Sequence, residues 1–446
     1  MLSKMPSRRL TTLLAGSSAF VIFIFLLRTA FSTGSSSSSS DPFPLLSTVS
    51  APPPIPKWNQ PRKDIHKTYN LPLAPPLLIG FTRSWPILLQ AVVSYITAGW
   101  PPSQIYVVEN TGTQLANKHG KLSLQNPFFL NHTQLGSVLG VNIIQTPVLL
   151  SFAQLQNYYL HLALTRDWPY YFWSHQDVLT LSFEAGLDDV TPPYNQPGYK
   201  TVYELGCQAL HEARTAQDER DEKWAVRFFA YDHLALVNPA AYEAVGGWDT
   251  LIPYYMTDCD MHSRLLMDNW TMLDAPGGTV TDTSSALRDL AALYRMDGVE
   301  PDLVDPNPPA PPEEADTSDK RHTKRRGQGA RKAQGGGQQE ENADSINNKA
   351  SDPNLDYYWA LRHASDLMFW SKHGERGRNT WQGGQHGGQG EPYHYPAEGF
   401  AEAIDVVTEA GREVYRRKWG HRDCDLIAGA GLKIDDQWRV EKDWKD

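Results

Sequence analysis

Cysteines, a basic face and internal repeats are all scarce or missing in this 446-residue sequence. Its three cysteines, Cys207, Cys259 and Cys424, allow at most one disulfide within the chain, and the sequence does not choose the pair. The net charge of −10 is spread along the chain without a basic face, so a nucleic-acid partner is not expected. No repeat is visible, which leaves hydrophobic patterning as the guide to the fold.

The N-terminus carries a candidate membrane anchor. Lys4, Arg8 and Arg9 precede an apolar run over residues 10–27, which as a helix is about 27 Å long, close to the thickness of a bilayer core. A cleaved signal peptide is the alternative. The positive N-terminal side predicts a cytosolic tail over residues 1–9 and a lumenal remainder. We therefore expect a single-pass type II protein of the Golgi or ER membrane.

Two segments have the composition of disordered chain. Residues 28–75 are rich in Ser and Pro, which predicts an extended, mobile stem. Residues 296–354 contain almost no apolar side chains, which predicts a disordered insertion. The basic stretch within the insertion resembles a nuclear or nucleic-acid signal, but it has no such partner in a lumenal loop. The catalytic domain is expected over residues 76–295 and its helical C-terminal part over residues 355–446.

Strand and helix patterns alternate after the stem. A short apolar run over residues 77–82 is typical of a buried strand, and apolar residues at helical spacing follow it, with Ser84 as the expected N-cap. Further strands are predicted at residues 105–110, 141–146, 170–173 and 226–238. This order predicts an α/β fold with a mostly parallel, Rossmann-like sheet flanked by helices, preceded by the single transmembrane helix.

Polar residues follow three of these predicted strands. They are Thr82 and Arg83, then Glu109 and Asn110, then His175, Gln176 and Asp177. In open α/β sheets, ligands bind beyond the carboxyl ends of the strands. The sequence therefore predicts that these side chains border one binding site.

Asp177 is the candidate metal ligand of that site. A divalent cation held by one or two carboxylates is the usual Lewis acid on a diphosphate, and the end of a buried strand fixes such a carboxylate. His175 is a candidate second ligand. The alternatives are an aspartate that caps the next turn and a histidine whose hydrogen bonds are satisfied within the fold.

The stretch "GGWDTLIPYYMTDCDMHSRLL" holds the candidate base. Gly246 and Gly247 allow close approach of a ligand to the backbone. Asp258 and Asp260 open a predicted helix, and Asp258 is the candidate base, because a carboxylate beside the sugar can accept the proton of an attacking hydroxyl. The alternative is that both acids only cap the helix and that Asp260 pairs with Arg264.

Together these stretches resemble glycosyltransferases of the GT-A fold, chiefly the family-2-like enzymes. The resemblance covers roughly residues 77–269 and a "KWG" element near the C-terminus. It implies that Glu109, Asn110, Thr82 and Arg83 contact the nucleotide, and that Gly247, Trp248 and Asp260 border the acceptor side. It also implies that Asp177 and His175 hold Mn²⁺ or Mg²⁺, and that Asp258 is the base. His175 and Thr257 stand where these enzymes carry carboxylates, which puts the metal in doubt.

The sequence therefore predicts a glycosyltransferase that moves a sugar from a nucleotide-diphosphate-sugar, of which a UDP-sugar is the first choice, to an acceptor hydroxyl with inversion. Its expected partners are that donor, a glycan, glycolipid or glycoprotein acceptor, and the membrane. The alternative is an inactive, membrane-tethered scaffold of the same fold. A metallohydrolase based on His386 and His394 is disfavoured, because both lie in a Gly-rich loop.

Overall fold

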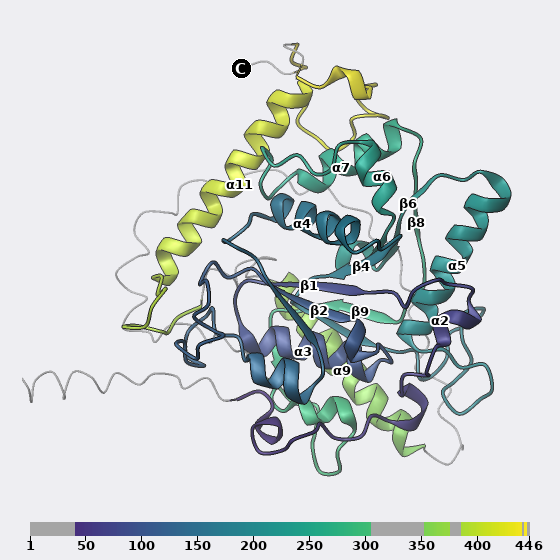
Figure 1. Ribbon diagram of the computed structural model, residues 1–446, viewed down its shortest axis with the longest axis vertical. Helices are drawn as coiled ribbons and strands as arrows, with labels where there is room; N and C mark the ends of the chain where they lie inside the picture. Colours follow the sequence, from purple (N-terminus) through teal and green to yellow (C-terminus); the bar gives the residue numbers. More distant parts are fainter. Residues whose placement is uncertain (1–40, 305–351, 375–384, 439–440, 444–446) are drawn as a thin grey trace, which may run out of the picture. The chain divides into compact units, whose positions relative to one another are not determined.

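The computed structural model describes residues 41–304, 352–374, 385–438 and 441–443 (Figure 1). These residues belong to one compact unit, Asp41–Asp446. The predicted cytosolic tail and membrane anchor lie outside the described residues, as do residues 305–351 of the predicted insertion.

A seven-stranded sheet forms the centre of this unit, in the order β3-β2-β1-β4-β7-β6-β8. Only β7 runs antiparallel to its neighbours, so the prediction of a mostly parallel sheet is confirmed. The strands are β1 Leu77–Phe81, β2 Ile105–Glu109, β3 Asn142–Gln145, β4 Tyr171–Ser174, β6 Trp224–Phe229, β7 Leu234–Val237 and β8 Thr271–Asp274.

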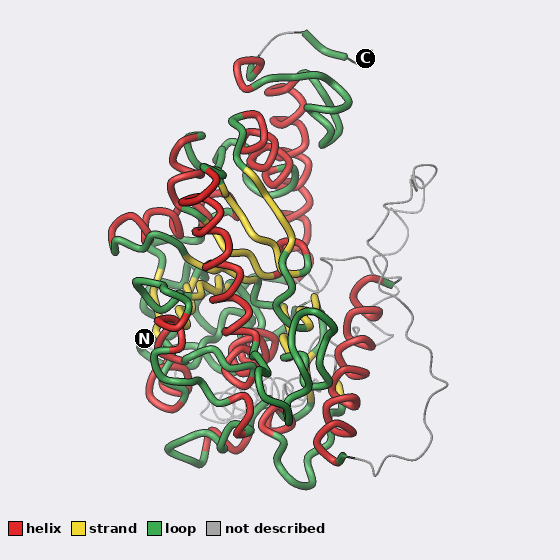
Figure 2. Tube along the Cα trace, turned by 90° about the vertical axis from the view of Figure 1, so that its right-hand side faces the viewer, coloured by secondary structure: helices red, strands yellow, loops and turns green. Residues whose placement is uncertain are grey.

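Helices cover both faces of the sheet, as Figures 1 and 2 show. Side chains of α4, α6 and α7 form a hydrophobic core on one face. Side chains of α3, α5 and α9 form the larger core on the other face. The helices are α2 Ile65–Thr68, α3 Trp85–Thr97, α4 Phe152–Thr165, α5 Val202–Arg220, α6 Pro239–Ala244, α7 Thr257–Met267, α9 Pro353–His373 and α11 Ala397–Trp419.

The first β-α-β unit matches its sequence pattern. Strand β1 is buried on both faces because helices pack above and below it, which explains its unbroken apolar run. Helix α3 then returns the chain so that β2 pairs with β1 in parallel, with Leu77 opposite Ile105. Ser84 precedes α3 as predicted, but it has φ 72° and its side chain makes no capping hydrogen bond.

The segment predicted as one strand over residues 226–238 is instead a hairpin. Strands β6 and β7 pair antiparallel, joined by a short 3₁₀ turn over Tyr231–His233. Ala230 and Tyr231 have φ of 58° and 56°, and this left-handed backbone reverses the chain. The prediction was wrong here because both strands are apolar, and no Gly or Pro marks the reversal.

A second, two-stranded sheet continues from the end of β4. Strand β5, Val178–Leu181, pairs antiparallel with β9, Thr279–Asp282. The backbone N–H of Thr283 donates to the carbonyl of Asp177 at 2.8 Å. This pairing brings Asp282 beside Asp177, although the two residues are far apart in the sequence.

The end of the predicted stem and the start of the predicted insertion both pack against the domain. Phe43 and Leu46 are buried in the main core, so the chain from Asp41 onward is not the free stem that was predicted. Its Ser and Pro content concealed these apolar anchors. Leu303 also packs on the core, and with Val304 it forms β11, which pairs with β10, Ala286–Leu287.

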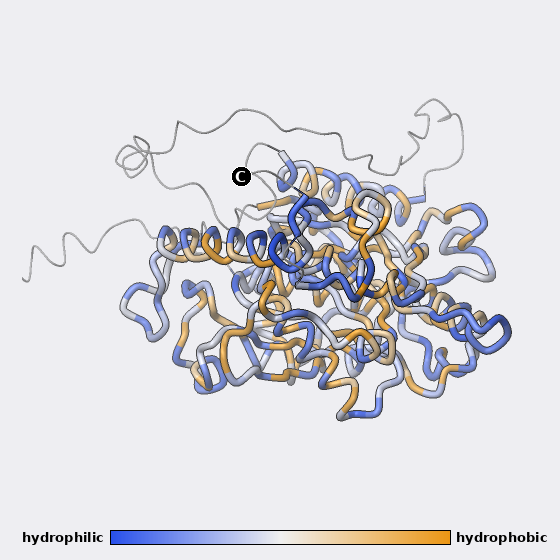
Figure 3. Tube along the Cα trace, turned by 90° about the horizontal axis from the view of Figure 1, so that it is seen from above, coloured by the Kyte–Doolittle hydropathy of each residue, from blue (hydrophilic) through white to orange (hydrophobic). Residues whose placement is uncertain are grey.

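The C-terminal helix α11 packs against the start of α7. A small core joins Tyr415 and Trp419 of α11 to Ile252 and Met256, which precede α7. A disulfide links Cys259 to Cys424, and Cys207 remains a buried free thiol. Helix α11 carries both apolar and polar residues along its length (Figure 3), and Tyr415 and Trp419 near its end are buried.

No helix among the described residues is long and apolar enough to cross a membrane. The predicted transmembrane helix therefore has no support in the described fold, and the predicted single-pass Golgi or ER location is not kept. The apolar run over residues 10–27, on which that prediction rested, lies outside the described residues.

Candidate functional site

A cavity of about 630 Å³ lies at the carboxyl ends of the parallel strands. Thr82 follows β1, Asn110 follows β2, and His175, Gln176 and Asp177 follow β4. All of these residues line the cavity. Its volume falls within the range of about 300–1,000 Å³ that ligand pockets occupy. The sheet therefore places a ligand-sized cavity where its topology predicts one.

Asp177 lines this cavity and binds a lysine. The ammonium of Lys372, in the last turn of α9, lies 2.6 Å from Oδ2 of Asp177 and also contacts Oδ1 of Asp282. Lys372 is only 3% exposed. Burial works against the charged forms, but the opposite charges outweigh it, so the pKa of Asp177 lies below and that of Lys372 above the ordinary value.

Histidines surround the same carboxylates. Nε2 of His373 lies 3.0 Å and Nε2 of His233 lies 3.8 Å from Oδ2 of Asp282. His175 stacks on Phe152, and its Nε2 lies 3.6 Å from Oδ2 of Asp232. Burial lowers the pKa of His233, whereas for His175 the hydrogen bond and charge of Asp232 outweigh burial and raise its pKa.

Asp258 lines the same cavity from the first turn of α7. The hydroxyl of Tyr231 donates to Oδ2 of Asp258 at 3.0 Å. Tyr231 belongs to the hairpin turn that also carries Asp232 and His233. One turn therefore connects the carboxylate of Asp258 to the charged cluster around Asp177, and the two predicted acids share one cavity.

Of the residues predicted to contact the nucleotide, Thr82 and Asn110 line the cavity. The backbone N–H of Thr82 donates to Oε1 of Gln176 at 2.8 Å, which ties the end of β1 to the turn after β4. The side chain of Asn110 binds the backbone of Leu150 through 2.7 and 2.9 Å hydrogen bonds, which holds the loop before α4 against the sheet.

Glu109 and Arg83 do not line the cavity. Glu109 is 1% exposed, and its carboxylate accepts hydrogen bonds from Asn117 at 2.7 Å and from His132 at 2.9 Å. The guanidinium of Arg83 lies 3.7 Å from the ring centroid of Phe400 in α11, and burial lowers its pKa to about 10. Both side chains support the cavity wall from behind.

Gly247, Trp248 and Asp260 also lie one layer behind the cavity. The backbone of Gly247 has φ 72°, and a Cβ there would meet the side chain of Asn157 at 2.8 Å, so glycine is required for packing. Trp248 packs edge-on against Phe152, which does line the cavity. Asp260 is fully buried in an ion pair with Arg264 at 2.8 Å. Asp260 therefore forms the ion pair with Arg264 that was given as the alternative to a role in binding.

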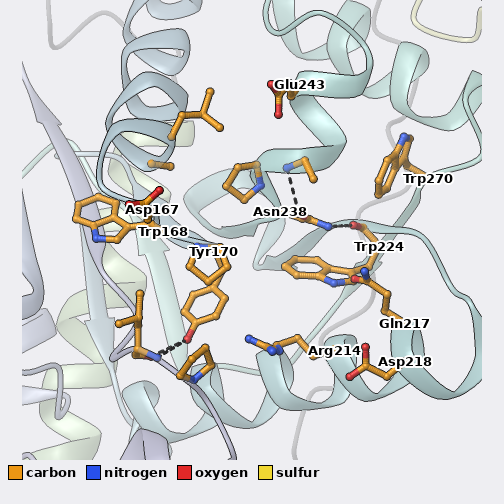
Figure 4. Close-up of a pocket in the computed structure, with 17 residues that line it drawn as sticks. Asp167, Trp168, Tyr170, Arg214, Gln217, Asp218, Trp224, Asn238, Glu243 and Trp270 are labelled. Carbon is orange, nitrogen blue, oxygen red and sulfur yellow. Dashed lines mark hydrogen bonds between the residues drawn. The ribbon is translucent and has the colours of Figure 1, made fainter.

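A second cavity, of about 650 Å³, lies at the amino end of β4 (Figure 4). Trp168, Tyr170, Arg214 and Trp270 line it, together with Asp218 of α5. None of the predicted site residues borders it, and it lies at the opposite end of the parallel strands from Asp177.

The predicted metal ligands do not form a converging set of donors. Among the described residues, only His421, Asp423 and Asp425 form a group of three such side chains whose ligand atoms lie within 4.8 Å of one another. This group follows α11, does not border the cavity, and has two exposed carboxylates of a kind that is common without a metal. At Asp177 the ammonium of Lys372 stands between the carboxylates instead.

Sequence reasoning missed Tyr231, Asp232, His233, Asp282 and Lys372, all of which line the cavity. The chain reversal at "AYDH", residues 230–233, lies between two apolar strands, so the apolar pattern did not reveal it. Asp282 and Lys372 reach the site through the β5–β9 pair and the end of α9, and neither belongs to a motif. The one signal in the sequence was the helix that resumes after the predicted insertion, since that helix is α9, which carries Lys372.

The sequence matches no protein-family model and no curated protein. Among solved structures, the fold is similar to the mannosyltransferase PcManGT from Pyrobaculum calidifontis in complex with GDP-Man and Mn²⁺. That match has 11% sequence identity and a TM-score of 0.29, and covers 47% of this chain and 60% of that one, less than two thirds of its length. A cytidylyltransferase from Leptospira borgpetersenii matches with 9% identity and a TM-score of 0.26, over 46% of this chain and 76% of that one. Both matched proteins are transferases, but overlaps this limited carry no argument about activity.

Proposed function

We propose that the cavity binds a nucleotide-diphosphate-sugar and that the protein transfers the sugar to an acceptor hydroxyl. The observation that carries the proposal is that Asp177 and Asp258 line one cavity at the carboxyl ends of the strands. Cations beside Asp177 suit a diphosphate, and a half-buried carboxylate at Asp258 suits a base. One cavity thus offers both functions that the transfer needs.

A polar part and an apolar part of the cavity would bind different parts of the donor. Near Asp177, Lys372 and the imidazole of His175 are positioned to hold phosphate oxygens, since both can donate charge-assisted hydrogen bonds. Apolar side chains of the loop before α4 and of α11, namely Leu149, Leu150, Ile404 and Val407, form the part that suits the base or the sugar.

In the proposed step, Asp258 accepts the proton of the acceptor hydroxyl. The acceptor oxygen then bonds to the anomeric carbon while the bond from that carbon to the diphosphate oxygen breaks and its electron pair leaves with the diphosphate. Attack from the side opposite the leaving group inverts the anomeric centre. The first turn of α7 places Asp258 at the cavity, and the hydrogen bond from Tyr231 holds its carboxylate there.

The test is the release of nucleoside diphosphate by the purified protein from a panel of UDP- and GDP-sugars. Asp258→Asn keeps the size of the side chain and removes the base, so the rate should fall by about 10²–10⁴-fold. Asp218→Asn is the matched control, because Asp218 lines the second cavity. Equal rates for wild type and Asp258→Asn would remove Asp258 from the mechanism. No release from any donor would contradict the proposed function.

A further inference from the structure

Lys372 occupies the position between two carboxylates where a divalent cation would bind. Its ammonium contacts Asp177 at 2.6 Å and also contacts Asp282. The two carboxylates come from the ends of paired strands, where the β5–β9 hydrogen bonds fix their spacing. The ammonium comes from the last turn of α9, whose Ser365 also bonds to Thr281 of β9 at 2.7 Å. Asp282 and Lys372 therefore lie in regular secondary structure, and Asp177 directly precedes β5.

The side chain of Lys372 has little freedom to leave. It is 3% exposed, and removing this buried cation would leave the carboxylate of Asp177 without the ammonium that it contacts. A divalent cation could replace it only by displacing this ammonium. The donor atoms around Asp177 do not form a converging set of three among the described residues, so the site does not fit a metal as it stands.

Each carboxylate around Lys372 has a basic partner. Asp177 contacts the ammonium, and Asp232 lies beside His175. Asp282 contacts the ammonium and lies beside the imidazoles of His233 and His373. A diphosphate that enters the cavity therefore meets an available ammonium rather than an uncompensated group of acids.

We propose that Lys372 is a built-in cation that takes the place of a divalent metal ion, so that the protein binds nucleoside diphosphates without metal. This inference rests on the proposed function, because it concerns the donor diphosphate of that same cavity. The ammonium holds Asp177 and Asp282 together and turns a hydrogen-bonding proton toward the phosphate oxygens. Since a lysine has three donors, two can stay on the carboxylates while the third binds the ligand.

Calorimetry with UDP and with GDP tests the inference on the wild-type protein, without any substitution. The titrations are done once in EDTA and once with Mn²⁺. We expect affinities that agree within about threefold. Binding in Mn²⁺ but not in EDTA would overturn the inference and leave the proposed function intact. Absence of binding in both buffers would overturn the proposed function and the inference together.

The variant Lys372→Met gives the complementary result. Without the ammonium, Asp177 and Asp282 still face one point, so this variant should bind UDP or GDP at least 10-fold more weakly in EDTA and regain affinity with Mn²⁺. Equal affinity of the variant and the wild type in EDTA would overturn the inference. Lys372→Arg keeps a cation, and it provides a second variant if the methionine variant does not fold.

Binding of Mn²⁺ alone gives a readout that does not depend on a nucleotide. Electron paramagnetic resonance counts bound Mn²⁺ in a His421→Ala background, which disables the exposed group after α11. We expect one more bound Mn²⁺ in Lys372→Met than in its parent. Arg362→Ala is the matched control, because Arg362 lies on the same helix and bonds to Thr279 of β9 at 2.7 Å without contacting the carboxylates. An equal count in parent and Lys372→Met would overturn the inference.

Discussion

The indole nitrogen of Trp419 donates a hydrogen bond to Oδ1 of Asp260 at 2.9 Å, across 159 positions of sequence. Lys418 binds the same carboxylate at 2.7 Å and Asp249 at 2.7 Å. The "KWG" element thus anchors α11 to the "GGWD" segment and to the helix that carries Asp258. The "KWG" and "GGWD" stretches therefore stabilise the fold behind the cavity, and other residues line the cavity itself.

Loss of the hydrogen bond to Asp260 should destabilise the protein. Trp419→Phe keeps most of the ring but removes the donor from a fully buried carboxylate, so the free energy of unfolding should fall by about 1–3 kcal/mol. Urea unfolding measures the change. The control is Trp359→Phe, since Trp359 is 49% exposed and its replacement should cost less than about 0.5 kcal/mol. Equal losses in the two variants would contradict the importance of this contact.

The disulfide between Cys259 and Cys424 should stabilise the junction of α7 with the segment after α11. It closes a loop with a sequence separation of 165, and Cys424→Ser should lower the free energy of unfolding by about 2–5 kcal/mol. Unfolding in a reducing agent provides the control: wild type should fall to the level of Cys424→Ser, and the variant should not change further. A wild-type protein unaffected by reduction would contradict the bond's role.

Tyr231 should support Asp258 without taking its place. Tyr231→Phe removes the 3.0 Å hydrogen bond that holds the carboxylate of Asp258 in place, so nucleoside diphosphate release should slow. The maximal rate should fall by about 10-fold, less than for Asp258→Asn. Initial rates of both enzymes at saturating donor measure the change. An unchanged rate would mean that the hydrogen bond does not position the base.

The pair between His175 and Asp232 should make stability depend on pH. The pKa of His175 is raised in the fold, so its contribution is fully present below the ordinary value of about 6.5 and is lost as the pH rises through the raised pKa. The difference in unfolding free energy between wild type and His175→Gln should therefore shrink between pH 5.5 and pH 8.5, a window chosen about that ordinary value. His161→Gln, at an exposed position of α4, should show no such trend. A difference that grows with pH would contradict the assigned protonation.

The sequence was sufficient to predict the order of the first strands and the place of the cavity. Unbroken apolar runs identified β1, β2 and β4, and the strand-end rule then placed Asp177 where the cavity is. The position of Asp258 followed from the start of α7. Such features depend on neighbours in the sequence, which is why pattern reasoning reached them.

The charge partners could not be predicted in the same way. Lys372 lies 195 residues from Asp177, at the end of a helix that follows a long break in the pattern. Glu109 and Arg83 look like binding residues in the sequence, but His132 and Phe400, from other parts of the chain, pack against them. Which polar residue faces a cavity and which supports its wall is decided by tertiary packing, and no local pattern records that choice.

Photo-crosslinking tests the central claim most directly, because it asks where a nucleotide binds. The wild-type protein is irradiated with azido-substituted UDP or GDP and the labelled peptides are identified by mass spectrometry. The account predicts labels in residues 149–155 or 231–233, which line the cavity at the carboxyl ends of the strands, and competition by unmodified nucleotide. Competed labels confined to residues around Trp168, Arg214 and Trp270, in the second cavity, would contradict it.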